Sequence, residues 1–218
     1  MLRDRAGLWL MIFLSGATAL VSFRFLILGL PVAFGDLAEH LPDRWWSFVL
    51  HVVAAPVALF FGALQFMPGI RARRPIWHRW SGRLYVAAVM VGGLSGLVLG
   101  FNSLGGPVAS AGFVLLAVFW MLFTWQGLRM ARARRYVEHR QWMIRSFALT
   151  FAAVTLRLYL VLFGLAGFEY AAAAVYLGWI CWVPNLLFAQ WWLRRAPLPA
   201  GPLPATSMDT APDVQLRN

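Results

Sequence analysis

The chain has 218 residues, 61% of them hydrophobic, with a formal net charge of +11 and a mean hydropathy of +0.68. Because a soluble domain averages about 45–50% apolar residues, this composition excludes an ordinary soluble protein and indicates an integral membrane protein. Cys181 is the only cysteine, which excludes an intramolecular disulfide and a Cys-x-x-Cys metal or redox motif.

Six stretches are apolar over the roughly 20 residues that a helix needs to cross a bilayer. In chain order they cover residues 8–30, 46–68, 80–101, 109–129, 143–166 and 171–193, and we number them spans 1 to 6. The first is too long for the apolar core of an ordinary signal peptide, so we interpret it as a retained helix. The sequence therefore predicts an all-α integral membrane protein with six transmembrane helices.

The chain is expected to form one transmembrane domain over residues 1–195. Residues 196–218 are rich in proline and small side chains, so we expect them to form a disordered cytoplasmic tail.

The basic residues are all arginines, and they collect on one side of the predicted spans. With a cytoplasmic N-terminus, 16 of the 19 arginines lie in or beside inner segments, all except Arg24, Arg44 and Arg157. This positive-inside distribution explains the net charge without a nucleic-acid partner, and it predicts a bacterial inner-membrane protein with both termini cytoplasmic. Tryptophans are expected at both interfaces: Trp77, Trp80, Trp125, Trp142, Trp191 and Trp192 inside, Trp45 and Trp46 outside.

Two similar segments open spans 3 and 5. They read HRWSGRLYVAAV from His78 and HRQWMIRSFALTFAAV from His139, and each follows an arginine-rich inner loop. Spans 2–3 and 4–5 could therefore be parallel repeats. The similarity is short, so a chance resemblance stays open.

Polar and small residues recur on one face of each central span, since an α-helix has about 3.6 residues per turn. The faces consist of His51, Ala55, Ala58, Gly62 and Gln65 in span 2, His78, Gly82, Tyr85, Gly92 and Gly96 in span 3, and His139, Ser146, Thr150 and Arg157 in span 5. A polar face turned to lipid is costly. We therefore expect a central four-helix bundle of spans 2–5 with these faces turned inward.

The inner mouth of this bundle is one candidate site. It contains His78 and His139 together with Arg79, Arg83 and Arg145. The histidines either contact lipid phosphates and cap their helices, or share one interior site. The glycine face of span 3 serves either helix packing or a flat ligand.

A second candidate group lies in the outer half of the spans, where Arg24, His51 and Arg157 are expected to form a polar cluster. This cluster is either a structural hydrogen-bond network or part of a binding site. In the first outer loop, Asp36, Glu39, His40 and Asp43 have spacing that suits a metal. Pro42 breaks any helix there, which favours an ordinary acidic loop.

The segments LHVVAAPVALFFGALQF from Leu50, HRWSGRLYV from His78 and HRQWMIRSFALTFAAVTLRLYL from His139 resemble an uncharacterised bacterial family of multi-pass membrane proteins, the domain of unknown function DUF2306. The resemblance covers residues 46 to 190. It implies a membrane protein and brings no established activity.

The arrangement is also similar to the six-helix transmembrane cytochromes b, which hold haems between spans 2 and 4 and between spans 3 and 5. That likeness implies haem b with His78 and His139 as axial ligands, and His51 as half of a second pair. Span 4 contains no histidine, which departs from the pattern.

Three function classes are open. The favoured one is a binding protein that takes a lipid or a small anionic ligand through its His-Arg site, since anionic lipids attract membrane-surface arginines by about 1 kcal/mol each. The second is a haem-binding electron-transfer protein, which would be a cytochrome b-like oxidoreductase. The third is a transporter or a membrane-embedded enzyme, although no HExxH, GxSxG or P-loop motif is present.

Overall fold

The computed structural model describes residues 2–29, 32, 44–67 and 69–195, and these residues form helices and no strand. The helices are α1 (Leu2–Ser22), α2 (Phe25–Leu28), α5 (Trp45–Leu64), α6 (Ile70–Arg73), α7 (Pro75–Gly100), α8 (Gly106–Arg132), α9 (Tyr136–Thr150), α10 (Ala152–Leu165), α11 (Tyr170–Ile180) and α12 (Val183–Arg195). Residues 33–43, with the four candidate metal ligands, and the tail 196–218 lie outside the described residues.

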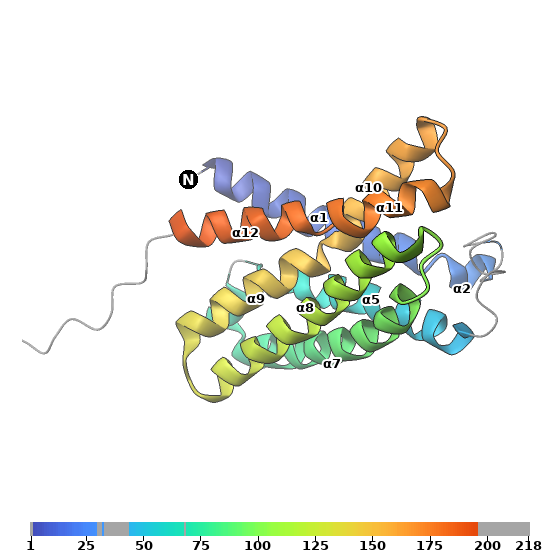
Figure 1. The fold of residues 1–218 in the computed structure, drawn as a ribbon. Helices are drawn as coiled ribbons and strands as arrows, with labels where there is room; N and C mark the ends of the chain where they lie inside the picture. Colours follow the sequence, from blue (N-terminus) through green and yellow to red (C-terminus); the bar gives the residue numbers. More distant parts are fainter. Residues whose placement is uncertain (1, 30–31, 33–43, 68, 196–218) are drawn as a thin grey trace, which may run out of the picture.

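Six helical segments are long and apolar enough to cross a membrane. They are Arg5–Leu28, Trp45–Leu64, Pro75–Gly100, Gly106–Arg132, Tyr136–Leu165 and Tyr170–Arg195. The predicted all-α membrane fold with six spans is confirmed. The end of α12 lies at the same end of the molecule as the N-terminus and the α8–α9 connection (Figure 1), as an even number of spans requires. We call this end, which carries the arginine-rich helix termini, the arginine-rich end.

Helices α5, α7, α8 and α9 form the central bundle (Figure 1). α5 packs on α7, α7 on α8, α8 on α9, and α9 closes the ring against α5. The two helices that begin at the arginine-rich end, α7 and α9, therefore face each other across a diagonal. α1, α11 and α12 pack outside this ring, against α5, α8 and α9 respectively.

The central helices reach beyond the predicted spans at the arginine-rich end. α7 begins at Pro75 and α9 at Tyr136, so His78 and His139 lie in the first turns of their helices. Proline suits the first turn of a helix, because its missing N–H would have no partner there. Arginine and tryptophan side chains tolerate the membrane interface, which allows the helices to continue into it.

Spans 5 and 6 are each broken near the same level. Pro184 removes a backbone N–H and its ring opposes the carbonyl of Ile180, where α11 ends. α9 ends at Thr150, whose hydroxyl bonds back to the Ser146 carbonyl at 3.1 Å, an interaction that bends helices. The carbonyl of Cys181 at the second break accepts hydrogen bonds from the side chains of Thr155 and Asn185. The bond from Thr155 joins the two spans close to their breaks.

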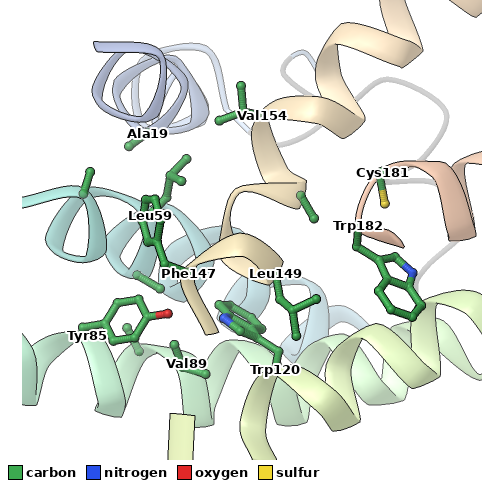
Figure 2. Packing of buried hydrophobic residues seen from close by; sticks show 14 residues of the cluster. Ala19, Leu59, Tyr85, Val89, Trp120, Phe147, Leu149, Val154, Cys181 and Trp182 are labelled. Atoms are coloured by element: carbon green, nitrogen blue, oxygen red, sulfur yellow. The ribbon is translucent and has the colours of Figure 1, made fainter. Parts of the chain in front are cut away.

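The core between α5, α7, α8 and α9 combines large rings with small residues. Tyr85, Trp120 and Phe147 project into it from three helices (Figure 2) and are buried. At Gly62 of α5, an added Cβ would lie 2.7 Å from the Tyr85 ring and 2.8 Å from the Phe147 ring. The predicted inward face of span 2 thus serves close packing at this position.

A closed chain of hydrogen bonds links α7, α8 and α9 inside this core. The distances are 2.8 Å from Trp120 Nε1 to Thr150 Oγ1, 2.8 Å from Thr150 Oγ1 to Tyr85 Oη, 2.6 Å from Tyr85 Oη to Ser146 Oγ, 2.6 Å from Ser146 Oγ to Thr124 Oγ1 and 2.7 Å from Thr124 Oγ1 to the Trp120 carbonyl.

The direction of this chain follows from its two ends. The indole N–H can only donate and the Trp120 carbonyl can only accept. Thr124 therefore donates to the carbonyl, Ser146 to Thr124 and Tyr85 to Ser146. The single Thr150 hydrogen is shared between Tyr85 Oη at 2.8 Å and the Ser146 carbonyl at 3.1 Å. Each hydroxyl donates once and accepts once within the chain, so these buried polar groups are satisfied and fix the register of the three helices.

Candidate functional site

The two histidines of the inner candidate site lie at the same end of the bundle. His78 precedes Tyr85 by seven residues, and His139 precedes Ser146 by seven. The hydroxyls of Tyr85 and Ser146 meet across the α7–α9 diagonal. Seven residues make about two helical turns. His78 therefore lies on the same face of α7 as Tyr85, and His139 lies on the same face of α9 as Ser146, each about two turns closer to the arginine-rich end. The two histidines are also within electrostatic range of each other, so the structure places them at the same end of the bundle.

The histidine rings differ in their hydrogen bonds. His139 Nδ1 lies 2.8 Å from the Gly127 carbonyl of α8. Because a carbonyl only accepts, Nδ1 carries the hydrogen, and the neutral ring presents Nε2 as an acceptor. His78 Nδ1 is buried and has no hydrogen-bond partner among the described residues.

The candidate arginines of the inner mouth lie apart from this pair. Arg79 and Arg83 are exposed on the outer face of α7. Arg145 donates from Nε to Gln190 Oε1 of α12 at 3.0 Å, which ties α9 to α12. The structure therefore separates the inner candidate residues into a histidine pair inside the bundle and arginines on its outside.

Arg79 and Arg83 border a hollow on the surface of α7, which we call the α7 hollow. It is open, has a volume of about 240 Å³ and is lined by Ile76, Arg79, Trp80 and Arg83. These residues follow helical i, i+3, i+4, i+7 spacing and so share one face. The Arg83 guanidinium lies 4.9 Å from the centre of the Trp80 ring, and Arg79 Nε donates to the Pro75 carbonyl at 3.3 Å.

Arginine–tryptophan pairs surround the same end of the molecule. We call them the Arg–Trp belt: Arg83 with Trp80, Arg132 with Trp125, Arg140 with Trp192, Arg145 with Trp142 and Arg195 with Trp191, at 4.5 to 6.0 Å from guanidinium carbon to ring centre. Glu138 is the only carboxylate at this end among the described side chains, and Arg135 binds it at 2.7 Å. The belt therefore carries a large excess of positive charge.

The outer candidate residues come together at the opposite end. Arg157 of α10 donates from Nη2 to Ser22 Oγ of α1 at 2.8 Å and from Nη1 to the Ala153 carbonyl at 2.7 Å. The charge of Arg24 acts on Arg157, and that of Arg157 acts on His51. His51 Nδ1 lies 2.9 Å from the Gly92 carbonyl of α7, so Nδ1 donates there.

The glycine face of span 3 is filled. A Cβ added at Gly92 would lie 3.4 Å from the Trp120 ring, and one added at Gly96 would lie 3.0 Å from the His51 ring. These glycines let two rings pack against the α7 backbone, so they leave no room for a flat ligand.

A family model described as a predicted membrane protein, DUF2306, matches residues 48–193. The chain belongs to the DUF2306 family. In this DUF2306 protein the matched region runs from within α5 to two residues before the end of α12. It contains the candidate histidines and arginines except Arg24, and it leaves out the four candidate metal ligands of the first outer loop. Comparisons with curated proteins and with solved structures give no match.

Two residues that contribute to the sites of this DUF2306 protein were not singled out in its sequence. Ser22 accepts from Arg157, and Gln190 accepts from Arg145. Both are uncharged polar residues within apolar spans, a signal too common to identify a partner. Among the described residues, no group of three or more histidine, cysteine or acidic side chains could hold a metal ion.

Proposed function

We propose that this DUF2306 protein is an inner-membrane protein, with both termini cytoplasmic, that binds an anionic lipid headgroup or a small anionic ligand at its arginine-rich face. The observation that supports this most directly is the α7 hollow, where two exposed guanidinium groups border one open space together with an indole and an isoleucine.

The chemistry of the α7 hollow suits an amphiphilic anion. The planar guanidinium groups of Arg79 and Arg83 match the geometry of phosphate oxygens. Trp80, which is 58% exposed, has the amphipathic ring that is favoured at the membrane–water interface. Ile76 adds apolar surface beside it. A lipid phosphate could therefore bind between the arginines while its chains follow the apolar surface of α7.

The rest of the Arg–Trp belt supports the same proposal. The positive-inside distribution assigns this end to the cytoplasmic side, where the membrane surface is negative. Glu138 is already paired with Arg135. The negative charge that balances the other arginines of the belt therefore has to come from groups other than the described side chains.

The test is the affinity for phosphatidylglycerol, measured by titration of the purified protein in phosphatidylcholine nanodiscs. The double variant R79Q/R83Q removes two surface charges, each worth about 1 kcal/mol, so the affinity should fall about 30-fold. R44Q is the matched control, because Arg44 lies at the opposite end and bonds the Asn102 carbonyl. Equal affinities in all three proteins would refute the proposal.

One observation favours haem binding as a second candidate function. His139 donates from Nδ1 to a carbonyl, which orients the ring and leaves Nε2 free, as in many metal-ligating histidines. With His78 it would supply two axial ligands at the arginine-rich end, and a bound haem would support one-electron transfer. The filled space over Gly92 and Gly96 does not fit a second haem beside His51. A dithionite-reduced spectrum without haem bands, after haem addition, would reject this candidate.

A further inference from the structure

The α7 hollow presents its two guanidinium groups side by side. Arg79 and Arg83 are four residues apart, so their side chains leave the same face of α7 about one turn from each other. Like charges at this spacing repel each other and destabilise a helix slightly. An anion that contacts both arginines removes this repulsion, and its effect grows with the negative charge that it carries.

Most N–H donors of the two arginines are available to a ligand. Arg79 donates from Nε to the Pro75 carbonyl, and its two Nη groups have no partner among the described residues. Arg83 contacts the Trp80 ring, an attraction to the ring face that needs no hydrogen-bond acceptor. Because each guanidinium can hold two oxygen atoms at once, the pair suits an anion with more than two terminal oxygens.

The helices around the hollow contain no negative charge. Residues 44–137 include no aspartate or glutamate, and this stretch contains α7 together with α5, α6 and α8, which pack against it. Arg71 and Arg73 in the last turn of α6 add further positive charge. The hollow also lies over the first turns of α7, where the helix dipole favours an anion. These surroundings favour a doubly charged ligand over a singly charged one.

The exposed face of α7 continues from the hollow as apolar surface. Its exposed side chains recur at spacings of four and seven residues and so share one face: Trp80, Leu84, Val91 and Val98. A hydrocarbon chain can follow this face from the arginines toward the membrane centre. The combination of paired guanidinium groups and an apolar face fits an anion that carries acyl chains.

Resting on the function proposed above, we propose that the α7 hollow prefers a lipid that ends in a phosphate monoester, such as phosphatidic acid, over a phosphodiester lipid such as phosphatidylglycerol. A phosphate monoester has three terminal oxygens, and its second ionisation has a pKa of about 6, so it carries close to two negative charges at neutral pH. A phosphodiester has two terminal oxygens and one charge. The monoester therefore uses both guanidinium groups more fully.

The test is a titration of the purified protein in phosphatidylcholine nanodiscs with each lipid, at pH 8 and at pH 5. At pH 8 the wild-type protein should bind phosphatidic acid at least about tenfold more tightly than phosphatidylglycerol, which one additional charge-assisted hydrogen bond supplies. At pH 5 only about a tenth of the monoester is doubly charged, so the preference should fall to about threefold or less. Protonation of His78 and His139 at pH 5 would strengthen the binding of both anions, so it cannot cause this loss.

Single substitutions separate this preference from general attraction to anions. R79Q and R83Q should each reduce the preference at pH 8 to about threefold or less, because one guanidinium remains. R132Q is the matched control, since it removes an arginine of the Arg–Trp belt outside the hollow, and it should keep the preference. Glycerol 3-phosphate, which carries the same phosphate without acyl chains, should bind at least about tenfold more weakly than phosphatidic acid.

Three results would overturn the proposal in distinguishable ways. Equal affinities of the wild-type protein for the two lipids at pH 8, or a preference that survives in both single variants, would reject the monoester preference and leave anionic-lipid binding intact. Equal affinities for glycerol 3-phosphate and phosphatidic acid would assign the hollow to a soluble phosphate monoester. Unchanged binding of both lipids by R79Q/R83Q would reject the function proposed above together with this preference.

Discussion

At the scale of single residues, polar side chains in this protein have two distinct arrangements. Tyr85, Ser146 and Thr150 belong to a chain in which every hydroxyl is satisfied. In contrast, His78 Nδ1 has no hydrogen-bond partner among the described residues, and Arg157 has more N–H donors than its two hydrogen bonds use. Satisfied polar groups specify a packing, whereas a polar group with unused donors or acceptors within a span is a candidate binding position.

Removing one hydroxyl should test the closed chain. Y85F deletes the acceptor of Thr150 and the donor to Ser146, and buried hydrogen bonds in membrane proteins are worth about 0.6 kcal/mol each on average. The free energy of unfolding in detergent should therefore fall by about 1 kcal/mol. Y136F is the control, because Tyr136 is 65% exposed. Equal stability of the two variants would show that the chain contributes nothing.

Arg157 should matter more to stability than an arginine of the belt. R157L loses the bonds to Ser22 and Ala153, whereas R132L loses one surface contact with Trp125. We expect R157L to lower the melting temperature in detergent by several degrees more than R132L, since a loss of about 1 kcal/mol shifts it by a few degrees in a domain of this size. Equal melting temperatures would contradict a structural contribution from the Arg157 hydrogen bonds.

At the scale of helices, periodicity predicted much of what the structure shows. Seven-residue spacing put His78 with Tyr85 and His139 with Ser146 on inward faces, and the two histidines do lie at one end. Periodicity could not predict which side chain each of these residues contacts, because that depends on the relative rotation and height of two helices. The bond between Arg157 and Ser22 joins residues 135 positions apart, and no local pattern encodes such a distance.

The helix breaks and the glycine face show the same limit. Pro184 is a visible signal for the break in span 6, but the break after Thr150 depends on side-chain bonds that a sequence does not display. Gly92 and Gly96 were correctly placed on one face. Whether a glycine face admits a ligand or a neighbouring ring depends on α5 and α8, which supply His51 and Trp120.

Close contact between α8 and α11 gives a prediction at this scale. A Cβ added at Gly112 would overlap the backbone carbonyl of Gly178, and a backbone group cannot move aside as a side chain can. G112A should therefore cost about 1–3 kcal/mol of stability. G164A is the control, since nothing lies within 4 Å of the added Cβ there. A melting temperature unchanged in G112A would rule out this close approach.

At the scale of the whole molecule, charge and packing divide the protein into two ends. The arginine-rich end carries the Arg–Trp belt and the α7 hollow, and the opposite end carries the Arg157 cluster. The positive-inside rule predicts that the first end is cytoplasmic. Reporter fusions after Gly105 and at the C-terminus test this orientation. The C-terminal reporter should be active in the cytoplasm and the Gly105 reporter outside it, and the reverse pattern would invalidate the assignment.

The most direct test of anionic-lipid binding at the α7 hollow is native mass spectrometry of the intact protein released from nanodiscs with equal amounts of phosphatidylglycerol and phosphatidylcholine. The account predicts that the wild-type protein retains mainly phosphatidylglycerol, that R79Q/R83Q loses most of this preference, and that R44Q keeps it. Retention of both lipids in equal proportion by the wild-type protein, or the same preference in R79Q/R83Q, would contradict it.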